Sequence, residues 1–589
     1  MLSPSQIIVL ATPVFLGLIA LEYAWGVARG RNTYRLNDAI NSISLGMLSQ
    51  VSAVLTRLFR VGIYTAVFSS LALWRNDAFW LSWYGWLLAL VFYDLCYYAL
   101  HRAGHEVAVF WAAHVVHHQS QDYNLSTALR QTSSGALLGW IFYVPMALAG
   151  VPPLVFGVVA LIDLLYQFWV HTEHVPKLGW FDRWFCSPSN HRVHHAVNDT
   201  YVDRNYGGVL IVWDRLFGSF QEEGERCVYG TRTALNSWDP LWSNAEVYWS
   251  LAKDSWHARS WGDKLRVWFK PPGWRPADVA ERFPKPAFDL AKVARYHPPM
   301  ARGLAWFAGV QFVALMAGVV WFLWHADTLA VGQSFAWLAA LGAGMWAIGA
   351  VMQGRIRPLE VLMVEAAALS TATAVQQLLA WHQVFKPLAM LLAIAYVLLR
   401  WRAGPRRFTL LLAGALALCL LGDVLLMLPG LFIPGLVAFL LAHLCYIALF
   451  KQGQPWFPSG RALVIALAYA GGLYAILFPS LGPVLKVACA AYALVIALMT
   501  AQAVGRAAQL RDANAVAVAV GAALFMLSDS LLAINKFALP LPLAPLWILA
   551  SYYAAQLLIV HNAQPGAAVA AASYSENSSP ALFGGTTPR

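Results

Sequence analysis

Histidines are concentrated in one stretch of the chain. Ten of the 16 histidines lie between His101 and His195, in four tight groups: His101-Arg-Ala-Gly-His105, His114-Val-Val-His117-His118, His171-Thr-Glu-His174 and His191-Arg-Val-His194-His195. On a helix, residues three or four apart share a face, so these spacings each direct several imidazoles into one place. Imidazole binds iron, copper, nickel and zinc, and eight or more convergent histidines exceed the coordination sphere of one ion. The pattern predicts a dinuclear metal centre.

A haem protein with two histidine ligands is the competing interpretation of these groups. Haem needs single ligands on opposing helices, and the doublets His117-His118 and His194-His195 are wasteful for that purpose. In the third group His171 alone suffices, so we interpret His174 as a non-ligand. The six remaining histidines are isolated, and we interpret them as ordinary polar residues: His257, His297, His325, His382, His443 and His561.

Two aspartates lie within apolar segments of the second half of the chain. Asp423 and Asp529 have similar surroundings, Leu-Gly-Asp-Val-Leu-Leu and Leu-Ser-Asp-Ser-Leu-Leu. Charged residues in apolar helices are expensive and mark functional sites by default. A parallel repeat would bring both carboxyls to similar depth around one cavity. Chance similarity of the two segments, and a structural or transport role for the carboxyls, are the alternatives.

The composition indicates that membrane helices position these residues. Of 589 residues, 59% are hydrophobic and only 12% are charged. The net charge of +11 arises mainly from Lys and Arg in short loops between apolar runs, as the positive-inside bias requires, so nucleic acid is not an expected partner. The six cysteines lie far apart without a C-x-x-C motif, which argues against a disulfide framework, an iron-sulfur cluster or a thiolate zinc site.

Apolar runs predict the membrane topology. The first, from Ile7 to Val27, is expected to be a retained helix because no Lys or Arg precedes Arg29 and because it contains Glu22. Three further runs are expected to cross or enter the membrane and to deliver the histidines to its cytoplasmic edge: 40–74, 79–100 and 134–170, the last broken by prolines into two arms.

The rest of the chain changes character twice. Residues 175–300 are rich in charge, Trp and Pro without a long apolar run, which predicts a cytoplasmic region on the membrane surface. Ten apolar segments follow, and the loops on one side hold nearly all their Arg and Lys, whereas we assign Lys386 and Lys536 to loops on the other side. The predicted fold class is therefore all-α, a polytopic membrane protein.

The histidine groups and the blocks between them resemble the fatty acid hydroxylase and sterol desaturase superfamily, and within it the alkylglycerol monooxygenase family. The resemblance covers roughly residues 94–230 and includes two specific blocks, Asp122–Gln131 (D-Y-N-L-S-T-A-L-R-Q) and Ser187–Phe220. Asn190 departs from the pattern, because relatives often carry a histidine there, which puts one contact behind the ligands in doubt.

This resemblance implies a monooxygenase that holds two iron ions and uses molecular oxygen with tetrahydrobiopterin or another external reductant. Its members hydroxylate the carbon attached to the ether oxygen of an alkylglycerol, and the resulting hemiacetal yields a fatty aldehyde. Glu106 is carried over as an additional, catalytic site residue. The metal ligands carried over are His101, His105, His114, His117, His118, His171, His191, His194 and His195. The sequence has no fused haem-binding or iron-sulfur donor, so the reductant is expected to come from outside.

The second half of the chain resembles the lysoplasmalogenase (YhhN-like) family of membrane hydrolases, over roughly residues 360–561. The resembling blocks include Gly422-Asp423, Gly435–Tyr446, Gly521–Asp529 and Tyr552–Leu558. The resemblance implies hydrolysis of the vinyl ether of a lysoplasmalogen. Two carboxyls close together in low dielectric cannot both ionise cheaply, so one of Asp423 and Asp529 would act as the acid and the other would orient water.

We therefore expect an integral, multi-pass protein of the bacterial inner membrane or an equivalent membrane, with a di-iron site on the cytoplasmic side. Its expected regions are a di-iron domain over 1–300, a connecting membrane hairpin over 301–358, a lysoplasmalogenase-like domain over 359–562 and a disordered tail over 563–589. Two alternatives remain open. One is a di-iron fatty acyl or sterol hydroxylase or desaturase with a non-catalytic membrane domain, and the other is a transporter.

Overall fold

The protein is almost entirely helical in the computed structural model, which describes residues 3–401 and 405–565. Over these ranges the β-type pairings are two isolated bridges, Phe185 with Leu210 and Ala196 with Tyr229. Twelve of the described helices are long and apolar enough to cross a membrane. The predicted fold class is confirmed, and the chain is an integral, multi-pass membrane protein. The predicted tail lies, from residue 566, outside the described residues.

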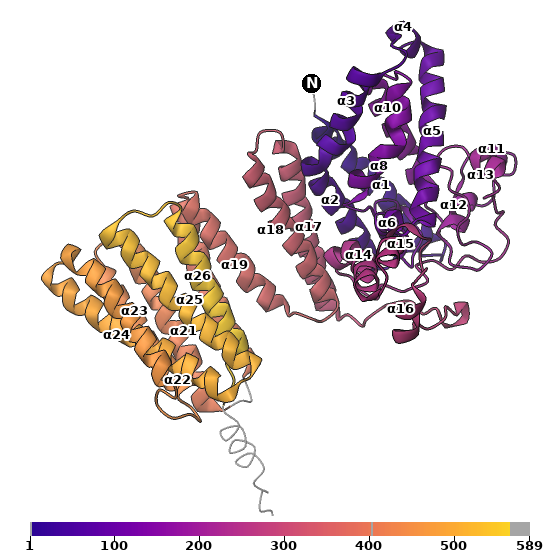
Figure 1. Ribbon diagram of the computed structural model, residues 1–589. Helices are drawn as coiled ribbons and strands as arrows, with labels where there is room; N and C mark the ends of the chain where they lie inside the picture. Colours follow the sequence, from indigo (N-terminus) through magenta and orange to yellow (C-terminus); the bar gives the residue numbers. More distant parts are fainter. Residues whose placement is uncertain (1–2, 402–404, 566–589) are drawn as a thin grey trace, which may run out of the picture. The chain divides into compact units, whose positions relative to one another are not determined.

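The chain divides into two compact units, unit 1 over Met1–Ile356 and unit 2 over Arg357–Arg589 (Figure 1). The predicted connecting hairpin corresponds to α17 (Arg302–His325) and α18 (Val331–Met352). This hairpin belongs to unit 1 because both of its helices pack against α2 (Leu36–Arg57) through one hydrophobic cluster, which contains Met47, Leu48, Val51, Phe322, Leu323, Leu341 and Met345. The boundary between the two units therefore follows the hairpin.

Unit 1 combines long helices with a loop-rich region. Its N-terminal half includes α1 (Pro4–Ala28), α2, α3 (Ile63–Leu71), α5 (Trp83–Glu106), α8 (Gly135–Gly139), α9 (Val144–Leu148) and α10 (Pro153–Trp169). None of the α-helices in the region 175–300 is among the candidate spans: α11 (Phe181–Trp184), α12 (Pro188–His195), α13 (Val212–Phe217), α14 (Pro240–His257), α15 (Trp261–Phe269) and α16 (Ala277–Arg282). This agrees with the predicted absence of a long apolar run.

Local sequence explains where the histidine-bearing helices of unit 1 begin. Ser82 caps α5 by accepting a hydrogen bond from the Gly85 amide at 3.1 Å. Ser187 caps α12 and is followed by Pro188, whose fixed φ suits the first helical turn. The prolines of 134–170 act as predicted, because Pro153 starts α10 and separates it from α9. By contrast, α5 is not among the twelve candidate spans although we expected 79–100 to cross the membrane.

Over its described residues, unit 2 is a bundle of eight α-helices, and together with α17 and α18 of unit 1 they correspond to the ten predicted apolar segments. Its helices are α19 (Pro358–Val375), α20 (Leu379–Arg400), α21 (Arg406–Met427), α22 (Phe432–Phe450), α23 (Gly460–Leu477), α24 (Pro483–Leu510), α25 (Ala513–Ala533) and α26 (Ala544–Asn562) (Figure 1). One expectation is wrong: Lys386 lies within α20 and is buried, because it pairs with a carboxylate inside the bundle.

Glycines let the two aspartate-bearing helices approach their successors closely. A methyl group placed on Gly422 of α21 would lie 2.5 Å from the ring of Phe439 on α22. One placed on Gly521 of α25 would lie 3.1 Å from the carbonyl oxygen of Ala555 on α26. Small residues at such contacts are a common way to pack membrane helices. The helix pairs α21–α22 and α25–α26, which carry Asp423 and Asp529, are thus closely packed.

Candidate metal centre

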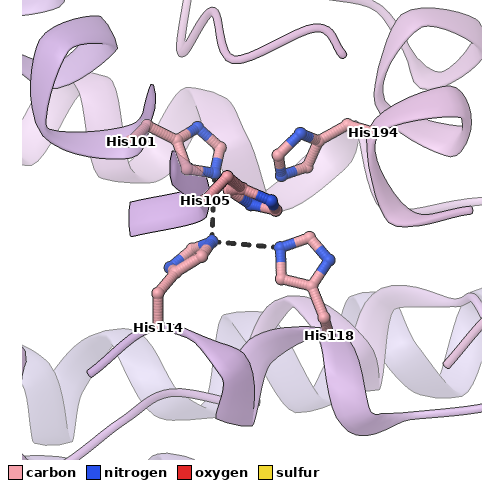
Figure 2. Close-up of side chains that lie close together, drawn as sticks. All are labelled: His101, His105, His114, His118 and His194. Carbon is pink, nitrogen blue, oxygen red and sulfur yellow. Dashed lines mark hydrogen bonds between the residues drawn. The ribbon is translucent and has the colours of Figure 1, made fainter. Parts of the chain in front are cut away.

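Nine histidines from four segments converge in unit 1 as two groups. The first histidine group comprises His101, His105, His114, His118 and His194 (Figure 2). The second histidine group comprises His117, His171, His191 and His195. Within each group the candidate ligand atoms all lie within 4.8 Å of one another. All nine predicted ligands are therefore brought together, and His174 belongs to neither group.

The histidine motifs do not each serve one group, and in this respect the sequence prediction is only partly right. Residues four apart stay together, as His114 and His118 do in the first group. The adjacent His117 points into the second group, because neighbouring residues project in different directions from a helix. The motif also forms a 3-10 helix, η2 (Val115–Gln119), and not an α-helix. On α12, His194 likewise parts from its neighbours and joins the first group.

The two groups share a wall of stacked rings. His118 of the first group stacks on His195 of the second, with ring centroids 4.3 Å apart. His194 lies beside this pair, with its ring centroid 4.7 Å from that of His118 and 5.4 Å from that of His195. Two ions bound in these groups would therefore be neighbours, which is the arrangement of a dinuclear centre.

Backbone carbonyls fix the tautomer of four of these imidazoles. Because a carbonyl oxygen can only accept, the Nδ1 atom facing it must carry the proton, which leaves the lone pair on Nε2 for a metal. These Nδ1 atoms donate to the carbonyl oxygens as follows: His101 to Tyr206 at 2.8 Å, His117 to Arg130 at 2.9 Å, His171 to Gln167 at 2.8 Å and His194 to Arg204 at 3.0 Å.

The Nε2 atoms that these bonds leave without a proton are arranged to bind a cation. His117 and His171 approach through their Nε2 atoms at 3.1 Å, although both protons are already committed at Nδ1. Two facing lone pairs repel each other unless a cation lies between them. The Nε2 atoms of His105 and His194 are buried without a hydrogen-bond partner. Unsatisfied buried nitrogens are costly, so the nitrogen donors fit the binding of metal ions.

Burial keeps the imidazoles outside the membrane helices neutral. It lowers the pKa of His117 to about 4. Burial, and then the neighbouring imidazoles, hold the pKa values of His191, His194 and His195 well below the ordinary range. Metal ligands must be deprotonated, so the pocket selects the form of histidine that binds a metal at neutral pH.

Two buried aspartates hold the loop whose carbonyls orient the first histidine group. Asp214 accepts hydrogen bonds from the amides of Tyr206 at 2.8 Å and Gly207 at 2.7 Å. Asp94 accepts from the amides of Val209 at 2.7 Å and Leu210 at 3.0 Å. These bonds fix the segment that receives the Nδ1 protons of His101 and His194. Such outer contacts set the direction and basicity of the ligands.

The block Asp122–Gln131 supports the second histidine group from behind. Arg130 is 1% exposed, and its guanidinium donates to the Val116 carbonyl at 2.7 Å and to Asn41 at 2.8 Å. Its own carbonyl receives the Nδ1 proton of His117. The block also meets α1, because the Leu125 amide donates to Glu22 at 2.8 Å. This block thus supports η2 and supplies none of the candidate metal ligands.

Arg192 of α12 forms an ion pair with Glu223 and also holds the segment after α10. The Arg192 guanidinium donates to both carboxylate oxygens of Glu223, each at 2.7 Å. Its third branch donates to the carbonyls of Thr172 at 3.0 Å and Val175 at 2.8 Å. Since His171 directly precedes Thr172, this arginine fixes two ligand-bearing segments relative to each other.

Glu106 and Asn190, both singled out in the sequence, lie outside both groups. Glu106 pairs with Arg102 at 2.9 Å, and its side chain is 45% exposed at the end of α5. Asn190 donates to the backbone carbonyls of Asp182 and Phe185, each at 3.1 Å, so it anchors the start of α12. Glu106 therefore stays a predicted site residue, whereas Asn190 has a structural role because it holds the start of α12 in place.

In unit 2, Asp529 lines an apolar pocket and has two polar neighbours. Tyr492 donates to Asp529 at 2.5 Å, and His443 lies 3.4 Å from the same carboxylate oxygen. His443 was interpreted from sequence as an ordinary polar residue, but it is fully buried beside this carboxylate. The isolated position of His443 in the sequence gave no signal for this contact; only the block Gly435–Tyr446, which contains it, did.

Asp423 has different surroundings. It forms an ion pair with Lys386 at 3.2 Å and accepts a hydrogen bond from Tyr552 at 2.6 Å. It is not among the residues that line the pocket next to Asp529. The expectation of two carboxyls around one cavity therefore needs correction, because helices α20 and α26 supply Asp423 with partners of its own.

Comparison with known proteins agrees with this division of the chain. Residues 86–219 match the Fatty acid hydroxylase family, and residues 381–563 match the YhhN family. The chain is 37% identical to alkylglycerol monooxygenase of Homo sapiens over 329 residues, 55% of this chain and 72% of the relative. It is 41% identical to that of Danio rerio over 272 residues, 45% of this chain and 59% of the relative.

The similarity to a second protein lies in unit 2. The chain is 38% identical to lysoplasmalogenase TMEM86B of Homo sapiens over 156 residues, 26% of this chain and 64% of the relative. No solved structure matches the chain. The human alkylglycerol monooxygenase is matched over more than two thirds of its length, and the histidine groups lie in the matched family region. The chain therefore belongs to the fatty acid hydroxylase family, among the alkylglycerol monooxygenases, and carries a second domain of the YhhN family.

Proposed function

We propose that unit 1 is a di-iron monooxygenase that cleaves the ether bond of alkylglycerol lipids. The observation that carries this proposal is the pair of adjacent histidine groups, with nine nitrogen ligands in all, in a chain of the alkylglycerol monooxygenase family. Imidazole-rich sites suit iron among the biological metals. The substrate class is taken from the name of the relatives.

The reaction joins one oxygen atom of O2 to the carbon next to the ether oxygen, while two electrons and two protons reduce the other atom to water. Two iron ions held by the histidine groups would supply the oxidising chemistry for this step. The chain itself orients the Nε2 lone pairs through the carbonyls of Tyr206, Arg130, Gln167 and Arg204. The hydroxylated product is a hemiacetal, which separates into a fatty aldehyde and a glycerol hydroxyl.

The electrons must come from a separate donor, for which we propose tetrahydrobiopterin or another external reductant. We further propose that the histidine groups face the cytoplasm of a bacterial inner membrane or an equivalent membrane. This orientation is supported within unit 1 by Arg29, Arg31 and Arg35, which follow α1 and which the positive-inside bias assigns to that side.

A second activity is proposed for unit 2, hydrolysis of the vinyl ether of a lysoplasmalogen at Asp423 and Asp529. It is supported by an intramembrane carboxyl, Asp529, that lines an apolar pocket in a domain of the YhhN family. Both units would then release fatty aldehydes from glycerol ether lipids, unit 1 by oxygenation and unit 2 by addition of water.

The two activities can be separated by oxygen. With reductant and oxygen, the purified protein is expected to release aldehyde from a saturated alkylglycerol, and without oxygen it should release aldehyde only from a vinyl ether lysolipid. Hydroxylation of acyl lipids or sterols with no cleavage of ethers would instead favour the fatty acyl or sterol enzyme. Lipid transport by a protein without bound iron would favour the transporter.

A further inference from the structure

Unit 2 contains a pocket that is lined mainly by apolar side chains and is partly open to its surroundings. Its walls come from α21 to α25 and include Leu436, Phe439, Leu473, Ile496 and Met526. A hydrocarbon chain is the ligand that such walls fit.

Among the residues that line this pocket, Asp529 is the one with an acidic side chain. Its side chain is 18% exposed, so it reaches the pocket surface, whereas Asp423 is 2% exposed and does not line the pocket. Only a group that touches the bound lipid can transfer a proton to one of its carbon atoms. The pocket therefore distinguishes the two aspartates.

Two side chains hold Asp529 in place. Tyr492 lines the pocket and donates its hydroxyl proton to the Oδ2 atom of Asp529. His443 stands behind both, with its Nε2 atom 2.9 Å from the Tyr492 hydroxyl and 3.4 Å from Oδ2 of Asp529. Its Nδ1 atom is buried without a partner. The three residues come from α22, α24 and α25, so they meet only when these helices pack.

We propose that Asp529 alone transfers the proton in vinyl ether hydrolysis, that His443 and Tyr492 position it, and that Asp423 does not touch the lipid. This assignment rests on the proposed hydrolase function of unit 2. It replaces the scheme in which one aspartate acts as the acid and the other orients water by a single acidic carboxyl and a separate ion pair, because the Asp423 carboxylate is already neutralised by Lys386.

One carboxyl is sufficient for hydrolysis of the vinyl ether. The O–H bond of the Asp529 carboxyl breaks, and its proton forms a C–H bond at the vinyl carbon that is not attached to oxygen. The π electrons of the double bond form that C–H bond, and the ether oxygen stabilises the resulting cation. Water adds to the other carbon and returns a proton to the Asp529 carboxylate. The hemiacetal then separates into an aldehyde and an alcohol, without an oxidant or reductant.

The chain provides a matched control. Glu360, Tyr396 and His561 form the same kind of trio: Tyr396 donates to Glu360 at 2.9 Å, and the Nδ1 atom of His561 lies 3.1 Å from that carboxylate. This trio lies at the ends of α19, α20 and α26, with the His561 side chain 62% exposed, and it does not line the pocket. Substitutions there change the same chemical groups without reaching the lipid.

The test measures aldehyde release from a vinyl ether lysolipid by the full-length protein without oxygen, together with equilibrium binding of a saturated ether lysolipid. Asp529→Asn should lower kcat at least about 100-fold, the usual scale of general acid catalysis, with binding within about threefold. Tyr492→Phe and His443→Gln should lower kcat about tenfold with KM nearly unchanged, and His443→Leu should be worse than His443→Gln. Glu360→Gln, Tyr396→Phe and His561→Gln should match the wild type.

The ion pair is tested by removing both of its members. Asp423→Asn with Lys386→Met leaves no unpaired charge, and it should retain kcat within about tenfold of the wild type. The assignment of Asp529 as the proton donor would be overturned if Asp529→Asn or Tyr492→Phe lost lipid binding without a loss of kcat. It would also be overturned if Asp529→Asn were as active as an active wild type. A wild type that hydrolyses no vinyl ether would overturn the hydrolase function and the assignment with it.

Discussion

The Nε2 atoms of His117 and His171 face each other at 3.1 Å while the Nδ1 atom of each ring donates to a backbone carbonyl. Neither ring has a proton left for the other, so their approach is favourable only around a cation. The surrounding protein thus imposes a repulsive arrangement that a bound ion relieves. This is the structural reason to expect tight metal binding.

Each histidine group should hold its own ion. His194→Ala opens the first group and His117→Ala opens the second, so each variant should retain about one metal ion per chain where the wild type holds about two, and both should lose ether cleavage. Elemental analysis of purified protein measures this. His174→Ala is the control, because His174 belongs to neither group. Two ions in both test variants would refute the division into groups.

Support of the loop around Tyr206 should matter for metal affinity. Asp214→Ala leaves the buried amides of Tyr206 and Gly207 without acceptors, which frees the carbonyl that orients His101. We expect metal affinity to fall roughly 10- to 100-fold, as measured by competition with a chelator. Asp278→Ala removes a pair with Arg282 and an acceptor of the Arg259 amide, outside both histidine groups, and should bind metal like the wild type. Equal affinities in both variants would contradict this role.

Close packing at Gly208 predicts a position where even a methyl group is not tolerated. A Cβ atom there would lie 2.9 Å from carboxylate oxygens of both Asp94 and Asp163 and 2.8 Å from the ring of Tyr97. Gly208→Ala should lower stability by about 1–3 kcal/mol, the usual cost of overpacking. Gly224→Ala is the control, because its nearest neighbour would be the Tyr201 hydroxyl at 3.8 Å. Thermal unfolding that does not separate the two variants would argue against this close packing.

The Arg192–Glu223 pair should make stability depend on pH. Burial of Glu223 acts to raise its pKa, but hydrogen bonds from Arg192 and Ser189 outweigh it and hold the pKa below the ordinary value of 4.5. A lowered pKa in the folded state stabilises the protein above the unfolded value and loses this effect as the pH falls through the folded value.

Glu223→Gln should therefore melt at a lower temperature than the wild type at pH 7. The difference between the two melting temperatures should become smaller as the pH falls below 4.5. The melting temperatures are to be compared in metal-free protein, so that loss of metal at low pH does not contribute. Glu222→Gln is the control, since Glu222 pairs with Lys177 at the exposed surface. A difference in melting temperature that stays constant or grows toward low pH would contradict the assigned role of the Arg192–Glu223 pair.

Sequence reasoning recovered what depends on residue type and local spacing. Apolar run length predicted α17 to α26, and the spacing of the histidines together with the family resemblance predicted all nine members of the two groups. Periodicity also placed His114 with His118, because residues four apart share a face. These features are local, so the sequence alone contains them.

Features that depend on distant segments were not predictable in this way. His443 became significant only because α24 and α25 bring Tyr492 and Asp529 to it, and Lys386 was misplaced because its partner Asp423 lies on another helix. The assignment of His117 to the second group likewise requires His171, 54 residues away in the sequence. Pairings of this kind are decided by helix packing, which no single motif encodes.

The central claim is that unit 1 breaks an ether bond by oxygenation, and the source of the oxygen atom in the aldehyde tests it most directly. The iron-loaded protein would be supplied with a saturated alkylglycerol, reductant and isotopically labelled O2, and the aldehyde would be reduced at once to the alcohol so that its oxygen cannot exchange with water. We predict labelled alcohol from the wild type and none from His117→Ala. Alcohol whose oxygen comes from water, or intact alkylglycerol beside hydroxylated acyl chains, would contradict the account.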